Sequence, residues 1–122
     1  MKSKVCKLKD TPVAGGHGEE VKTEGSSTII HEAISADDGA QNFIMRVIEQ
    51  GPGRSSRGHA HEWEHEIFVL SGNGIAQIED EEFPISKDSV VYFAPNEWHK
   101  ITTPEGSEPL CWITVIPVNV HI

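Results

Sequence analysis

The chain has 122 residues, of which 37% are hydrophobic and 24% are charged. This length suits one domain, and the apolar fraction can form a modest core. Nineteen acidic residues against ten basic ones give a net charge of −9. An excess of negative charge disfavours broad contact with nucleic-acid phosphates or an anionic membrane surface. We therefore expect no nucleic-acid partner and no membrane partner.

The sequence shows no sign of export. Basic residues occupy four of the positions 2–9, but no apolar segment of the secretory kind follows them. No apolar stretch approaches the ~20 residues that a membrane span needs. Cys6 and Cys111 are too few for a disulfide framework, although a single bridge remains an alternative. These features predict a reduced protein of the cytoplasm.

The first elements along the chain are weakly patterned. Residues 1–26 contain Pro12, several glycines and several charges without clear periodicity, and we expect them to form an irregular N-terminal arm. From residue 27 the chain breaks into short β-branched or aromatic runs. We expect strands at 28–34, 42–48, 66–70, 75–79, 82–85, 89–93, 101–103 and 110–118.

Turn-forming residues separate nearly all of these runs, for example at 37–39, 51–53, 71–74 and 95–97. Strands that recur every 8–12 residues or so with turns between them indicate an antiparallel sandwich or barrel. No window reads as an amphipathic helix with caps at both ends. We therefore predict that residues 27–122 form a single all-β domain.

The seven histidines are unevenly distributed, and three of them fall within seven residues. His59 and His61 are two apart, so on a strand both side chains point to the same face. Two imidazoles on one face already form half of a transition-metal site. Three other histidines stand alone, and we expect ordinary surface or hydrogen-bonding roles for them: His17, His31 and His121.

His65 can join this pair only if the chain bends. On a straight strand it would lie about 13 Å beyond His61, whereas metal–nitrogen bonds are about 2 Å long. The segment 62–64 must therefore turn, so that His65 opens the next strand. His99 follows a turn at the end of another apolar strand and can supply a fourth ligand. The sequence thus predicts one metal ion held by His59, His61, His65 and His99.

Residues 61–65 also satisfy the H-E-x-x-H pattern of zinc peptidases. That chemistry requires a helix, which places the two histidines one turn apart. Gly58 upstream and the strand-like run 66–72 downstream disfavour a helix, and the pattern leaves His59 unexplained. A metallopeptidase is therefore the weaker interpretation.

The segment 53–72 resembles the first motif of the cupin superfamily. In that motif a glycine leads through H-x-H, here His59 and His61, to a third ligand and then to a glycine that closes a hairpin. Counting back from the closing glycine puts His65, and not Glu66, at the position of the third ligand. Most cupins carry a carboxylate or an amide near there, so this chain departs toward an all-histidine set.

The segment 88–99 resembles the second cupin motif in a degenerate form. Asp88 stands where a glycine is usual and Ala94 where a proline is usual. Asn96 occupies the tight-turn position, where its tolerance of the left-handed conformation makes the change physically mild. Thr103 replaces the asparagine that closes the motif.

Within the superfamily, the histidine-rich run is similar to small single-domain bacterial cupins with four histidine ligands, which often bind manganese. The likeness covers about residues 28–117. It implies a double-stranded β-helix (jelly-roll) barrel, usually a homodimer, with a small-molecule ligand or substrate. It also implies one divalent transition-metal ion per chain, with Mn or Fe favoured and Ni, Cu or Zn as alternatives.

Four neutral imidazoles leave a divalent ion with its full charge, which favours anionic or enolisable oxygen ligands. With Mn or Fe this predicts a dioxygenase-like oxidoreductase that acts on a small oxygenated compound. The alternatives are a metal-dependent binder or sensor without turnover, a lyase or isomerase, and a structural zinc site.

The walls of the pocket are less clearly marked. Arg46 interrupts an apolar strand, and it either binds a substrate carboxylate or makes a surface ion pair. Ile67 lies two residues after His65, so on a strand both side chains point to the same face. Trp112 and Thr114 likewise share one face of the last strand. We therefore expect Ile67 and Trp112 to line the pocket. The sequence assigns no catalytic residue.

Overall fold

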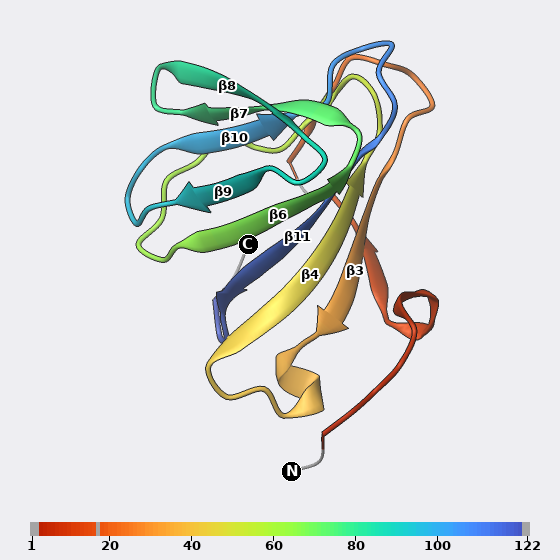
Figure 1. The fold of residues 1–122 in the computed structure, drawn as a ribbon, viewed down its shortest axis with the longest axis vertical. Helices are drawn as coiled ribbons and strands as arrows, with labels where there is room; N and C mark the ends of the chain where they lie inside the picture. Colours follow the sequence, from red (N-terminus) through yellow and green to blue (C-terminus); the bar gives the residue numbers. More distant parts are fainter. Residues whose placement is uncertain (1–2, 17, 121–122) are drawn as a thin grey trace.

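The computed structural model describes residues 3–16 and 18–120 and shows two antiparallel sheets packed face to face (Figure 1). The larger sheet has the strand order β1-β3-β4-β11-β6-β9, and the smaller has the order β2-β5-β10-β7-β8. This is the all-β jelly-roll architecture expected from the sequence. The strands are β1 (Val13–Gly15), β2 (Glu20–Val21), β3 (Thr28–Ile34), β4 (Phe43–Gln50), β5 (Arg54–Ser55), β6 (His65–Ser71), β7 (Asn73–Ile78), β8 (Glu81–Ser86), β9 (Val90–Phe93), β10 (His99–Thr102) and β11 (Leu110–Pro117).

All eight strands expected from residue 28 onward are present, with ends that differ from the expected ones by at most two residues. The turns between them use the conformations that the sequence indicates. Asp88 and Asn96, two of the departures in the second motif, have positive φ angles of 72° and 68°, so the backbone is left-handed at both positions. Thr103 is buried and its hydroxyl donates to the side-chain oxygen of Gln50 at 2.7 Å, which ties the end of β10 to that of β4.

The N-terminal segment differs from its expected irregular form. A 3-10 turn at Leu8–Asp10 precedes β1, which pairs with β3, and β2 pairs with β5. These strands of three and two residues are too short for a readable alternation. A polar contact holds the segment on the barrel, because the carboxylate of Glu19 accepts hydrogen bonds from Thr28 at 2.6 Å and from Arg54 at 3.3 Å. His17 and His121 lie outside the described residues.

The hydrophobic core lies between the two sheets. On β11 the inward positions alternate strictly with the outward ones, and the inward Leu110, Trp112 and Ile116 are buried. They share this inner face with Thr114, a buried polar residue in an otherwise apolar row. That polar position marks the side of the barrel where the histidines lie.

Cys6 and Cys111 are both free thiols, so the alternative of a bridge between them is not realised. Within residues 3–16 and 18–120, no helix has the length and apolarity that a membrane crossing requires.

Candidate metal centre

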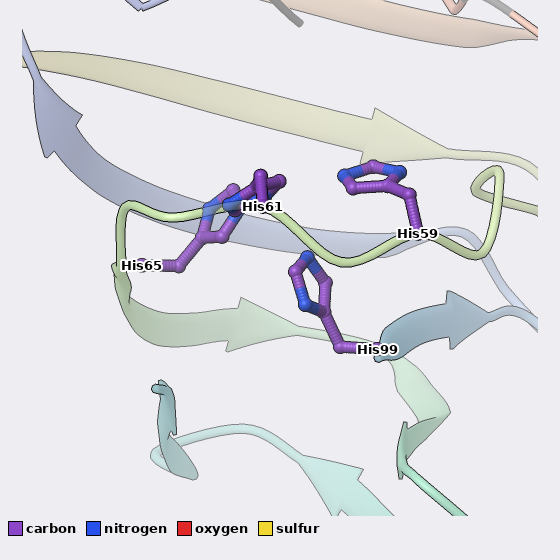
Figure 2. A group of neighbouring side chains, drawn as sticks. All are labelled: His59, His61, His65 and His99. Atoms are coloured by element: carbon purple, nitrogen blue, oxygen red, sulfur yellow. The ribbon is translucent and has the colours of Figure 1, made fainter. Parts of the chain in front are cut away.

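Four histidine side chains from three parts of the chain meet inside the barrel (Figure 2). His59 and His61 lie in the segment between β5 and β6, His65 is the first residue of β6, and His99 is the first residue of β10. One ring nitrogen from each of the four lies within 4.8 Å of the others. The structure therefore brings together the four residues that the sequence singles out as ligands.

The chain bends between His61 and His65, as the spacing argument requires. Residues 62 and 63 form the bend and β6 begins at His65, so residues 61–65 are not helical. The backbone N–H of Asn96 donates to the carbonyl oxygen of His61 at 2.6 Å and anchors the bend to the β9–β10 turn. The helical geometry of an H-E-x-x-H peptidase is not formed.

His59 is held directly against His99. Their backbones form an isolated antiparallel bridge with N–O distances of 3.0 and 3.2 Å. The preceding Gly58 allows this approach, because a Cβ atom there would lie 2.1 Å from the ring of Trp98. His59 thus reaches the cluster from a short bridge and not from the longer strand that the H-x-H spacing indicates.

The hydrogen bonds of the rings define which nitrogens face the cluster. The Nδ1–H groups of His61 and His99 donate to the carbonyl oxygens of Trp63 at 2.7 Å and Glu97 at 3.0 Å. Since a carbonyl only accepts, the Nε2 atoms of these two rings carry the lone pairs. Nδ1 of His65 lies 3.0 Å from the hydroxyl of Thr114, which is able to accept its proton. Such outer hydrogen bonds orient ligating histidines in metal proteins.

The Nε2 atoms have few protein partners. Within the described part of the chain, Nε2 of His99 is buried without a hydrogen-bond partner, and Nε2 of His61 lies 3.3 Å from Nε2 of His65. Two ligands at about 2.1 Å from one ion are separated by about 3.0–3.4 Å when the angle between them is 90–109°. The orphaned nitrogen, this spacing and the all-imidazole donor set together fit a divalent transition metal.

Burial keeps these imidazoles neutral. Desolvation, together with the charges of the neighbouring histidines, lowers the pKa of His65 to about 3. Desolvation likewise lowers the pKa of His99 to about 4 and shifts the pKa values of His59 and His61 downward. A neutral imidazole is the form that binds a metal ion, so the four histidines are in their metal-binding form at neutral pH.

Aromatic rings brace two of the histidines, a feature that the sequence analysis missed. Trp63 stacks on His61 with ring centroids 3.5 Å apart, and Phe93 stacks on His99 at 4.5 Å. The position of Trp63 between two ligands is a signal that was available in the sequence. No such signal marks Phe93, because its contact with His99 depends on the pairing of β9 with β6.

The three residues predicted to line the pocket have different positions. Ile67 and Trp112 are buried in the hydrophobic core between the sheets. Arg46 lies on β4, its side chain is mostly buried, and it forms an ion pair with Glu32 at 3.6 Å. Glu62 is exposed, and Glu64 accepts a hydrogen bond from the hydroxyl of Tyr92, so neither belongs to the histidine cluster.

The fold is an antiparallel jelly-roll barrel, and the histidine cluster inside it is a candidate metal site. The family model described as the cupin domain matches residues 46–116, which is more than half of the chain. The protein therefore belongs to the cupin-domain family. A comparison with the sequences of curated proteins gives no significant match.

Solved structures with the same fold cover nearly the whole chain. The polyketide cyclase RemF from Streptomyces resistomycificus has a TM-score of 0.78 and 27% identity, over 95% of this chain and 80% of that one. A protein described as a predicted oxalate decarboxylase from Thermotoga maritima has a TM-score of 0.75 and 20% identity, over 94% and 99%. A cupin 2 conserved barrel domain protein from Rhodopseudomonas palustris has a TM-score of 0.75 and 15% identity, over 93% and 75%.

Proposed function

We propose that this cupin is a metal-dependent oxidoreductase that holds one divalent ion, with Mn or Fe favoured, between His59, His61, His65 and His99. The observation that carries the proposal is the convergence of four ring nitrogens within 4.8 Å, one of them buried with no hydrogen-bond partner among the residues that the structure describes. When bound, such an ion supplies Lewis-acid chemistry to an oxygen ligand and, for Mn or Fe, redox chemistry with dioxygen.

The chain's own residues favour a small oxygenated substrate. Neutral imidazoles add no negative charge to the site, so anionic or enolisable oxygens of a diketone, a hydroxy acid or an enediol are favoured. Three of the four histidines are only partly buried, which leaves the cluster open to a ligand from solvent. On its inner side the buried Phe93 packs against His99 and excludes water.

A second candidate is redox-neutral carbonyl chemistry of the lyase or isomerase kind. The similarity to a polyketide cyclase at 27% identity favours it, because cyclisation of a polyketide activates carbonyl groups. Turnover without dioxygen separates the two candidates. Turnover that stops under anaerobic conditions supports the oxidoreductase, whereas unchanged anaerobic turnover supports the carbonyl chemistry. Tight binding without any conversion supports a binder or sensor.

The test begins with elemental analysis of protein purified without added metal. We expect about one divalent ion per chain, and loss of that ion in His65→Ala. His31→Ala is the matched control, because His31 lies on β3 outside the cluster. Wild-type protein that retains only a small fraction of one ion, even after reconstitution, contradicts the proposal.

We also propose that the protein works as a homodimer in the cytoplasm. The free thiols of Cys6 and Cys111 support a reducing compartment. Apolar side chains on the outer face of the larger sheet support a second copy of the chain as the partner. Fractionation of the source cells tests the compartment, and a measurement of the mass in solution tests the dimer.

A further inference from the structure

Arg46 lies on the inner face of the larger sheet, beside the histidine cluster. It pairs directly with Thr114 across β4 and β11, and opposed residues of antiparallel strands project from the same face. Thr114 is 2% exposed and its hydroxyl lies 3.0 Å from Nδ1 of His65. Adjacent strands are about 4.8 Å apart, so the backbone of Arg46 lies one strand spacing from Thr114, the residue that contacts His65.

The surroundings of Arg46 leave part of its hydrogen-bonding capacity unused. Its side chain is 15% exposed, and its Nε atom is buried with no hydrogen-bond partner among residues 3–16 and 18–120. The ion pair with Glu32 has an N–O distance of 3.6 Å, which is beyond hydrogen-bond range. The residues two positions away on the same face of β4, Ile44 and Ile48, are apolar. A buried guanidinium with an open donor costs free energy unless an acceptor completes it.

A carboxylate is the acceptor that suits this position. The planar guanidinium offers parallel N–H donors that match the two oxygens of a carboxylate, and charge-assisted pairs of this kind are the strong ones. The positive charge of Arg46 is also one of the smaller causes that lower the pKa of His65, which places it within electrostatic reach of the cluster.

We propose that Arg46 is the anion-binding residue of the pocket and that the substrates are small carboxylates. The carboxylate pairs with Arg46, while a carbonyl or hydroxyl oxygen of the same molecule faces the four histidines. Glu32 holds the guanidinium in place until the ligand completes its donors. This inference rests on the proposed function, because it supplies the substrate class for the same site.

The test compares two probes that carry the same 1,3-diketone, 4,6-dioxoheptanoate and its methyl ester. Affinities are measured by titration calorimetry on protein reconstituted with manganese, whose metal content is determined first. We expect the free carboxylate to bind about tenfold to a hundredfold more tightly than the ester to wild-type protein. Arg46→Met should remove this preference while it leaves the metal content and the affinity for the ester unchanged.

Two further variants keep the test decisive. Arg57→Met removes an equal charge from an exposed arginine, and it should retain the preference for the carboxylate. Glu32→Gln frees the guanidinium from its ion pair, and it should retain or increase the preference even if Arg46→Met does not fold. Equal affinity for the two probes in wild-type protein, or no binding of either, overturns the inference while the metal content still reports on the proposed function. A preference that survives in Arg46→Met also overturns it.

Discussion

At the scale of single residues, the orientation of His65 depends on one hydroxyl group. Thr114 is the polar residue in the apolar inner row of β11, and its Oγ1 lies 3.0 Å from Nδ1 of His65. When Nδ1 carries the proton and donates to Oγ1, the Nε2 lone pair faces the other imidazoles. In that tautomer the hydroxyl orients the ring so that Nε2 is free to bind a metal.

Thr114→Val replaces this hydroxyl with a methyl group of similar size. We expect the affinity for the metal to fall about tenfold to a hundredfold, because the loss of such an orienting partner typically has this effect. Competition with a chromophoric chelator measures the change. Thr114→Ser retains the hydroxyl and should stay close to wild type; an equal loss in both variants would show that packing, and not the hydrogen bond, is responsible.

The lowered histidine pKa values predict how stability depends on pH in the metal-free protein. Because the pKa of His65 is about 3 and that of His99 about 4 in the folded state, against an ordinary 6.5, the unfolded chain binds more protons between these values. The contribution of the two neutral histidines to the free energy of unfolding is therefore complete above pH 6.5, and it declines as the pH falls toward 4. Urea unfolding midpoints from pH 8 to pH 4.5 measure the decline.

His65→Gln separates this effect from that of the acidic residues, whose mutual repulsion weakens at low pH in both proteins. The variant should lose less stability than wild type over the same range, since one titrating group is absent. Parallel pH profiles for the two metal-free proteins would contradict the assignment of a depressed pKa to His65.

At the scale of elements, the β9–β10 turn positions two ligands at once. Asn96 has a φ angle of 68°, and its N–H donates to the carbonyl oxygen of His61, while His99 begins β10 three residues later. Asparagine tolerates the left-handed region better than alanine does, and glycine adopts it freely.

Asn96→Ala should therefore lower the free energy of unfolding by about 1 kcal/mol, whereas Asn96→Gly should stay close to wild type. Chemical denaturation measures both variants. The alanine variant should also bind metal more weakly, because the turn anchors the bend before His65. Equal stability of the alanine and glycine variants would show that the turn carries no conformational strain at this position.

The sequence predicted those elements whose signal is local. The strand at Thr28–Ile34 and the bend before His65 follow from β-branched runs and from the reach of a metal ion. The short strands β1 and β2 were not predictable, because two or three residues show no periodicity and their order depends on pairing with distant strands. The contact between Thr114 and His65 was missed for the same reason, since it joins residues 49 positions apart.

At the scale of the whole molecule, the outer face of the larger sheet is unusually apolar near its β9 edge. Ile113, Phe68 and Val90 are cross-strand neighbours on β11, β6 and β9. Phe68 is 41% exposed and Val90 is 78% exposed. Contiguous apolar patches of this kind mark interaction surfaces more often than ordinary solvent-exposed surface. The patch lies on the face opposite to Arg46 and Thr114, so a partner there leaves the histidine cluster accessible.

If this patch is the homodimer interface, a charge within it should dissociate the protein. Val90→Lys places an ammonium group at the centre of an isologous contact, where the symmetry brings two copies of the same surface together. We expect wild-type protein to sediment as a dimer of 13.4 kDa chains and the variant as a monomer at micromolar concentration.

Val13→Lys is the matched control, because Val13 is exposed on β1, at the other edge of the same sheet. A monomeric wild type contradicts the dimer, and dissociation by Val13→Lys alone assigns the interface to the β1 edge. Metal content should remain near one ion per chain in both variants, since neither side chain reaches the inner face where the histidines meet.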